Sequence, residues 1–226
     1  MINIFPTSLQ AATVFLAGVA FAAITPFRSI VGIDTLGLSN NSFALVMAFS
    51  AAGSAFASVV LGWLSDRLAD RRMLVLICAA MGIVANGVLL LIQTPVAFMT
   101  AFCVLIPFGS ALFSQSFSYS RAFFDLNQPD RSEFIMSLLR SGFTLAWIVV
   151  PPAAGLLAAN FTPFSVFGFA MAAHAIATIC VGLLWTRPET NVGARERKTS
   201  NKAAPLTIAR THIAGMPAVV LAQVAI

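Results

Sequence analysis

Residues 62–72 read GWLSDRLADRR, a short charged segment between two long apolar stretches. The flanking stretches, 42–64 and 73–92, are each long enough to cross a ~30 Å hydrocarbon core as an α-helix. Of the 226 residues, 59% are hydrophobic and 9% are charged, whereas a soluble domain has roughly 45–50% and 25%. This composition excludes a water-soluble fold and predicts a membrane protein with several spanning helices.

Four further apolar stretches have the length of a spanning helix, at 7–33, 96–119, 134–158 and 164–185. The tripeptide AFA at 20–22 is similar to a signal-peptidase site. Because no Lys or Arg precedes it and the apolar run continues beyond it, we expect an uncleaved first helix.

The fold class that follows is an all-α integral membrane bundle. We predict a six-helix bundle over residues 1–186, a basic connector at 187–205 and an incomplete seventh apolar segment at 206–226.

The positions of Lys and Arg predict how the bundle is oriented. Eleven of the thirteen follow the second, fourth and sixth stretches, Arg28 lies alone on the opposite side, and Arg140 lies within the fifth stretch. Cytoplasmic loops carry the excess of Lys and Arg. The amino terminus is therefore expected in the cytoplasm, and the net charge of +5 reflects topology rather than a nucleic-acid partner.

The segment 62–72 resembles the signature loop of the major facilitator superfamily, G-x-L-x-D-R-x-G-R-R, with one extra residue before the final Arg pair. Gly62 suits a close helix approach, and Asp66 suits a charge-assisted hydrogen bond at a helix end. The resemblance implies a cytoplasmic gate formed by this loop. The alternative is a merely solvated basic loop. The residues assigned to the gate are Gly62, Asp66, Arg67, Asp70, Arg71 and Arg72.

A second region resembles the sugar efflux transporter branch of that superfamily. Arg121 ends the fourth stretch, Arg131-Ser132-Glu133 precedes the fifth, and the fifth contains SLLRS at 137–141 and LAWIVVPP at 145–152. The resemblance implies two inverted three-helix repeats that equal the amino-terminal half of a transporter. It also implies a solute site between two such halves near mid-membrane, with Arg121 and Glu133 as charges at the gate end.

Polar residues recur at helical spacing on the fourth and fifth stretches. Such groups should face the bundle interior or a water-filled path, and neutral hydroxyls with one guanidinium suit a polyhydroxyl solute. Arg140 is the strongest candidate, with snorkelling towards the cytoplasm or pairing with a helix-end carboxylate as the alternative. The candidates for the solute path are Arg140, Ser114, Gln115, Ser118, Ser137 and Thr144.

Pro151, Pro152 and Gly155 indicate a bend in the fifth helix, which is either a moving element or a static kink. All carboxylates lie at span ends or in loops, so His174 is the group within the spans that could titrate; the alternative is a satisfied core residue. The sequence contains no metal cluster, cofactor motif or catalytic motif.

These features predict a transporter in a bacterial inner membrane rather than an enzyme. We expect export of sugars or similar polar solutes by alternating access, with a second half supplied by another chain or by self-association. Two alternatives stay open: a truncated remnant that does not transport, and a membrane-embedded partner or assembly protein that has kept the fold.

Overall fold

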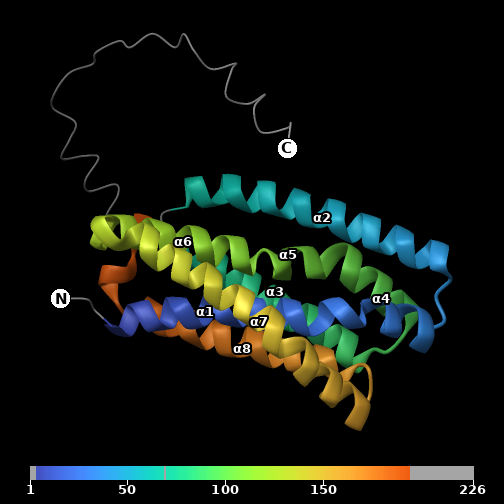
Figure 1. The fold of residues 1–226 in the computed structure, drawn as a ribbon. Helices are drawn as coiled ribbons and strands as arrows, with labels where there is room; N and C mark the ends of the chain where they lie inside the picture. Colours follow the sequence, from blue (N-terminus) through green and yellow to red (C-terminus); the bar gives the residue numbers. More distant parts are fainter. Residues whose placement is uncertain (1–3, 69, 194–226) are drawn as a thin grey trace, which may run out of the picture. The chain divides into compact units, whose positions relative to one another are not determined.

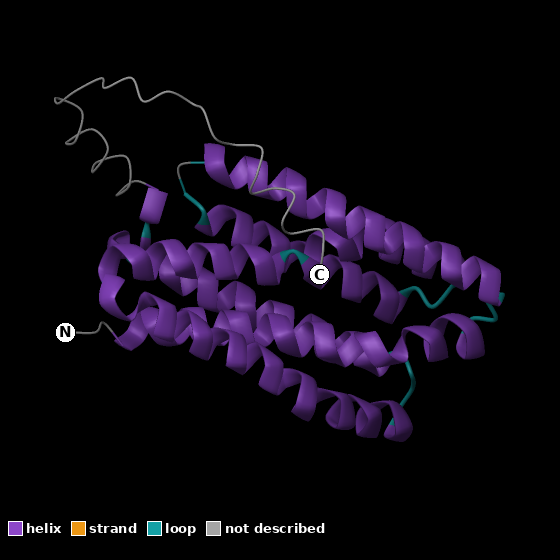
Figure 2. Cartoon of the chain, turned by 45° about the horizontal axis from the view of Figure 1, so that its top comes forward, coloured by secondary structure: helices purple, strands orange, loops and turns teal. Residues whose placement is uncertain are grey.

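The computed structural model describes residues 4–68 and 70–193, without the side chains of Ile4 and Asp66, and it is a bundle of helices (Figure 1). Six helical stretches are long and apolar enough to cross a membrane, which confirms the six predicted spans. The part of the chain that is described contains no strand (Figure 2). The six stretches are α1 (Ile4–Ile24), α2 (Asn40–Arg67), α3 (Arg72–Leu91), the rod of α4 (Pro95–Thr100), α5 (Ile106–Ser110) and α6 (Leu112–Asn127), α7 (Ser132–Asn160) and α8 (Ser165–Trp185).

Proline and hydroxyl residues set several helix boundaries. Pro26 interrupts the first apolar stretch, so that α1 passes into a 3₁₀ turn (Thr25–Phe27) and then a π-helical turn (Ile30–Thr35). Ser39 caps α2 by accepting a hydrogen bond from the backbone N–H of Ser42 at 3.2 Å. The first predicted span is therefore shorter than its apolar stretch.

Pro107 interrupts the fourth span. Proline lacks an N–H and crowds the carbonyl four residues earlier, and a π-helical turn (Ala101–Leu105) absorbs the mismatch. Helix α2 packs closely at this point through Gly53. A Cβ there would lie 3.0 Å from the Pro107 Cγ and 3.2 Å from the Cys103 carbonyl oxygen.

The helices pack in a reciprocal pattern. Helix α1 packs against α7 and α8, the α4–α6 rod packs against α2 and α3, and α3 packs against α8. This packing pattern fits two three-helix repeats, α1–α3 and α4–α8, that are related by a two-fold axis. The predicted connector 187–205 is described only as far as Gly193, and the predicted segment 206–226 lies outside the described residues.

Helices α2 and α7 are the least buried spans. In their most apolar windows 22% and 17% of the residues are buried, compared with 44–56% in the other four spans. The core has two clusters, one around Phe98 and Phe102 and one around Leu74 and Phe124. The six-helix unit thus has a packed interior and two exposed flanks.

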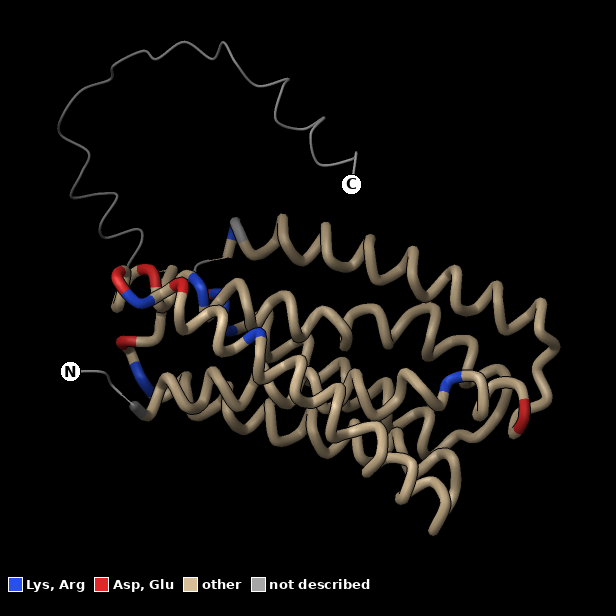
Figure 3. Tube along the Cα trace, viewed as in Figure 1, with Lys and Arg blue, Asp and Glu red and all other residues tan. Residues whose placement is uncertain are grey.

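Most charged residues of the described part lie at the two ends of the bundle, chiefly at the end where α2 stops (Figure 3), whereas Arg140 lies within α7. The connections at that end are those predicted to be rich in Lys and Arg. Arg28 and Asp34 lie in the opposite connection, between α1 and α2.

His174 of α8 sets the closest helix approach in the core. Its imidazole lies against Gly82 of α3, where a Cβ would fall 1.9 Å from the His174 Cδ2. A Cβ on Gly109 would in turn lie 2.8 Å from the Gly82 Cα. The imidazole Nδ1 is 2.9 Å from the Ala170 carbonyl oxygen. Gly82 therefore makes the space in which the ring lies, and Gly109 lets α5 approach the backbone of α3 at the same point.

We expect Gly82→Ala to destabilise the bundle by about 2–3 kcal/mol or to prevent folding, because overpacking a rigid contact forces a ring or a helix to move. The measurement is the midpoint of thermal unfolding of the purified protein in detergent. Gly182→Ala on α8 is the control, since no atom lies within 4 Å of its Cβ position. The Gly82→Ala/His174→Ala double variant should be more stable than Gly82→Ala alone. Equal midpoints for Gly82→Ala and the control would contradict the contact.

Candidate functional site

Arg72 is the centre of a buried polar cluster at the end of the bundle where α3 begins. Its side chain is 4% exposed, and its Nη2 lies 2.6 Å from the Asp70 Oδ2. Its Nη1 donates to the carbonyl oxygens of Leu184 (3.0 Å) and Arg187 (3.2 Å) and to the Thr190 Oγ1 (2.9 Å). A cation at the carboxyl end of a helix is favoured because it satisfies carbonyls that the helix leaves unpaired.

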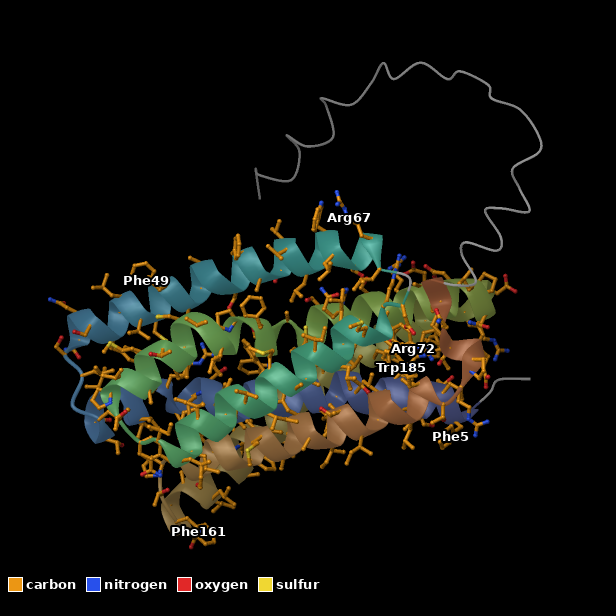
Figure 4. The ribbon with its side chains drawn as sticks, turned by 180° about the vertical axis from the view of Figure 1, so that it is seen from behind. Phe5, Phe49, Arg67, Arg72, Phe161 and Trp185 are labelled. Atoms are coloured by element: carbon orange, nitrogen blue, oxygen red, sulfur yellow. The ribbon has the colours of Figure 1, made fainter. Side chains whose placement is uncertain are left out.

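The same cluster also includes the fourth span. The Tyr119 hydroxyl of α6 donates to the Thr190 carbonyl oxygen at 2.9 Å, and the Asn191 Nδ2 donates to Asp70 at 3.3 Å. The Trp185 ring lies 5.1 Å from the Arg72 guanidinium carbon. Arg72 and Trp185 lie together at the joint between α3 and α8 (Figure 4). The cluster therefore holds α3, α6 and α8 together.

The other predicted gate residues lie differently. Arg67 points away from the bundle at the end of α2, with its guanidinium carbon 3.8 Å from the Trp63 ring centre (Figure 4). No described atom lies within 4 Å of a Cβ built on Gly62. The side chain of Asp66 lies outside the described part of the structure. A gating role for these residues stays a prediction.

Arg121 and Glu133, the predicted gate-end charges, form an ion pair between α6 and α7. The Arg121 Nη2 lies 2.6 Å from the Glu133 Oε1, and its Nε lies 3.7 Å from the Asp125 Oδ2. Ser132 also donates to Asp125. Because these side chains are largely exposed, the ion pair at the α6–α7 junction contributes little to stability.

The predicted polar residues of α7 lie on its exposed side. Ser137, Arg140, Ser141 and Thr144 are exposed, and the Arg140 guanidinium carbon lies 5.2 Å from the Phe117 ring centre of α6. Arg140 forms no ion pair with a carboxylate in residues 4–68 or 70–193. Its guanidinium is thus available to a group outside this bundle or to a solute.

The three candidates on α6 divide between two faces. Ser114 and Ser118 are exposed, whereas Gln115 is buried. The Phe113 and Phe143 rings lie 4.0 Å apart and join α6 to α7 beside them. The structure therefore brings Ser114, Ser118 and the α7 residues to the exposed surface, and it places Gln115 inside the bundle.

Helix α7 continues through Pro151 and Pro152 to Asn160. The two prolines remove two intrahelical hydrogen bonds. Gly155 lies one turn later, and a Cβ there would lie 3.7 Å from the Phe27 Cζ. A moving bend at these positions stays a prediction.

A cavity that the sequence did not indicate lies inside the bundle. Its empty volume of about 390 Å³ includes open solvent at its mouth, and its interior has room for only a few water-sized molecules; α1, α3, α5, α6 and α8 all contribute to it. Asn86 is 1% exposed, its Nδ2 donates to the Gly82 carbonyl at 2.7 Å, and its Oδ1 has no partner. The residues that line the cavity are Ala17, Ala20, Phe21, Ile24, Gly82, Asn86, Ile106, Gly109, Ser110, Leu112, Phe113 and His174.

The cavity combines aromatic side chains, Phe21 and Phe113, with one unsatisfied polar atom, the Asn86 Oδ1. Aromatic rings and a few convergent polar atoms are typical of small-molecule sites. The amide of Asn86 in the third span is the signal in the sequence that the pattern analysis missed. The described residues include no group of three His, Cys, Asp or Glu side chains that could hold a metal ion.

The family model of the Major Facilitator Superfamily matches residues 11–226. The chain belongs to this superfamily. It is 28% identical to sugar efflux transporter C of Escherichia coli, over 75% of this chain and 42% of that protein. It is 29% identical to sugar efflux transporter B of Salmonella typhimurium, over 76% of this chain and 42% of that protein.

A protein of Deinococcus radiodurans whose name also places it among sugar efflux transporters is 29% identical, over 86% of this chain and 49% of that protein. These relatives confirm the resemblance to the sugar efflux branch. The chain spans about half the length of the curated relatives it matches. No solved structure matches the chain. The chain is thus a member of this superfamily with six helices that are long and apolar enough to span a membrane.

We expect Arg72→Ala to lower the free energy of unfolding by roughly 3–5 kcal/mol, because removing one member of a buried ion pair leaves its partners uncompensated. Arg67→Ala is the control, since an exposed cation–π contact contributes about 1 kcal/mol or less. Thermal unfolding of the two purified variants tests the difference. Similar midpoints would contradict a structural role for the Arg72 cluster.

Proposed function

We propose that this chain forms one half of an exporter for sugars or similar small polar solutes, and that it works by alternating access with a second six-helix half. The names of the sugar efflux relatives support the solute class. Their greater length supports the need for a second half.

The observation that carries the proposal is the exposed polar face of α7. Four polar residues of this apolar span, Ser137, Arg140, Ser141 and Thr144, are exposed in the described bundle, and Arg140 lies against the Phe117 ring of α6. Hydroxyl and guanidinium groups are costly when they face lipid. We therefore infer that a second half or a water-filled path faces them.

Hydrogen bonding fits a polar solute at this face. The Ser141 hydroxyl donates to the Ser137 carbonyl at 3.0 Å, and the Thr144 hydroxyl donates to the Arg140 carbonyl at 3.1 Å. Since each hydroxyl hydrogen is used within the helix, each oxygen still offers lone pairs to a solute hydroxyl. Arg140 adds donors, so this face presents both partners that a polyhydroxyl solute needs.

The Arg72 cluster supports a rigid-body motion. It joins α3, α6 and α8, and buried charged hydrogen bonds resist separation. A half that is held in this way rocks as one unit, and the exposed residues near helix ends, Arg67 and the Arg121–Glu133 ion pair, are left to form contacts across the gate. The loop would then close the cytoplasmic side in one of two states.

We further propose that the protein lies in a bacterial inner membrane with its amino terminus in the cytoplasm. The support is the placement of eleven of thirteen Lys and Arg residues on one side.

We expect Arg140→Ala to lower sugar export at least tenfold, because the variant removes the cation of the exposed polar face. The measurement is loss of radiolabelled lactose, glucose and glucuronate, each tested separately, from loaded cells that produce the full chain. Arg131→Ala, an exposed arginine just before α7, is the matched control. Membrane amounts are equalised by immunoblot.

The outcomes of this experiment separate the alternatives. Equal export by Arg140→Ala and the control would contradict the role of Arg140. No sugar flux above that of cells without the chain would favour the remnant or the partner protein. If a cellular phenotype that depends on this chain is unchanged in Arg140→Ala, the alternative of a membrane-embedded partner or assembly protein is favoured.

The orientation has its own test. We expect a membrane-impermeant maleimide added to intact cells to label Asp34→Cys and to spare Asp130→Cys, because the two positions lie in connections at opposite ends. The unsubstituted chain, which has three cysteines within its spans, is the control. The reverse labelling pattern would show that the amino terminus lies outside.

A further inference from the structure

Arg28 is a cation that lies apart from the Arg72 cluster, just after the 3₁₀ turn that follows α1. Its guanidinium carbon lies 5.4 Å from the Phe21 ring centre and 5.6 Å from the Phe102 ring centre. Its Nη2 donates to the Thr25 Oγ1 at 3.2 Å. Phe102 is fully buried in the core, so the side chain turns inward from the end of α1.

The charge of Arg28 is incompletely compensated by the chain. Its Nε is buried and has no hydrogen-bond partner, and Arg28 forms no ion pair with a carboxylate among residues 4–68 and 70–193. Asp34, the acid in the same connection, is exposed and does not pair with it. Burial lowers the pKa of Arg28 from its usual value. Buried charges in proteins are normally paired, and two aromatic rings replace only part of the lost hydration.

We propose that Arg28 binds the carboxylate or phosphate group of a small soluble anion, and that the solute of the exporter is therefore an acidic sugar or a similar polar acid. That this anion is the exported solute rests on the proposed function. A guanidinium offers five donors in a planar fork that matches an oxyanion, and Arg28 uses one of them within the chain.

Phe21 connects this cation to the interior cavity. The Phe21 ring that lies beneath the Arg28 guanidinium also lines the cavity of Asn86 and Ser110. An oxyanion at Arg28 would place the rest of the same solute beside the Phe21 ring, at the edge of that cavity. Trp147 of α7 lies 5.7 Å from the same ring and extends the aromatic wall.

An oxyanion at this position has two possible sources, a small soluble anion and a lipid headgroup, because Arg28 lies at the end of the bundle in the connection after α1. Its side chain is partly exposed and lies over Phe102, which is fully buried in the core. This inward direction favours a small soluble anion over a headgroup held at the membrane surface, and the lipid comparison in the test separates the two.

The test is thermal unfolding of the purified full chain in detergent with glucuronate, glucose or inorganic phosphate, each at matched ionic strength. A ligand that binds only the folded state raises the midpoint. Glucuronate and glucose differ by one carboxylate, so we expect glucuronate to raise the midpoint at concentrations where glucose does not. Arg28→Gln should weaken the apparent affinity for glucuronate at least tenfold, and Arg28→Lys should retain part of it.

Arg187→Gln is the matched control, because Arg187 lies 5.3 Å from the Phe5 ring centre but is exposed and lies in the connection after α8. It should bind glucuronate as the unsubstituted chain does. Arg28→Gln should also unfold at or above the ligand-free midpoint of the unsubstituted chain, since it removes an unpaired charge. A lower midpoint together with unchanged glucuronate affinity would assign Arg28 a structural role and overturn the proposal.

Two further comparisons, with a lipid and with the neutral sugar, complete the experiment. Stabilisation by phosphatidylglycerol in nanodiscs, without stabilisation by glucuronate or phosphate, would overturn the proposal in favour of a lipid site. Stabilisation by glucose equal to that by glucuronate would overturn it and leave the sugar exporter intact. If no anion binds, the proposal fails, and the cell export measurement still decides the proposed function.

Discussion

Within the bilayer, every backbone N–H and C=O group must form its hydrogen bond inside the protein, and the fold follows from that constraint. Each span forms its hydrogen bonds within its own helix, and the exceptions occur at prolines. Pro26 ends α1, and Pro107 produces the π-helical turn against which Gly53 packs. Because apolar side chains gain little by leaving lipid for protein, close contacts between helices rather than hydrophobic exclusion set their positions. Gly82 and His174 are the clearest example.

Span number and fold class were predictable from the sequence because length and hydropathy determine them directly. The breaks inside the spans were only partly predictable. Pro26 and Pro107 are visible in the sequence, but the kind of helical turn that forms at each proline depends on the neighbouring helix. The sequence indicated Arg121 and Glu133 as charges at the same end of the bundle, but their ion pair is known only from the structure. The cavity and the partners of Arg72 join residues far apart in the chain, which periodicity within one helix does not reveal.

Polar residues in this bundle fall into two groups with different roles. Those around Arg72 satisfy one another and hold α3, α6 and α8 together. Those on α7 stay uncovered, and Arg28 and Asn86 retain unpartnered atoms. Unsatisfied polar groups are expensive in a low-dielectric interior, and they are retained where a ligand or a partner completes them. The distribution thus separates the polar residues that hold the bundle together from those that the proposals above assign to a solute or a second half.

The Arg72 cluster also bears on the order in which the protein is made. The partners of Arg72 at Leu184 and Thr190 follow it by 112 and 118 residues. At a synthesis rate of about 5–20 residues per second, α3 emerges roughly 6–24 s before α8 can meet it. During that interval Arg72 has only Asp70 as its partner and must stay near the membrane surface. The last described span therefore completes the assembly of the bundle, and the early helices remain loosely associated until it arrives.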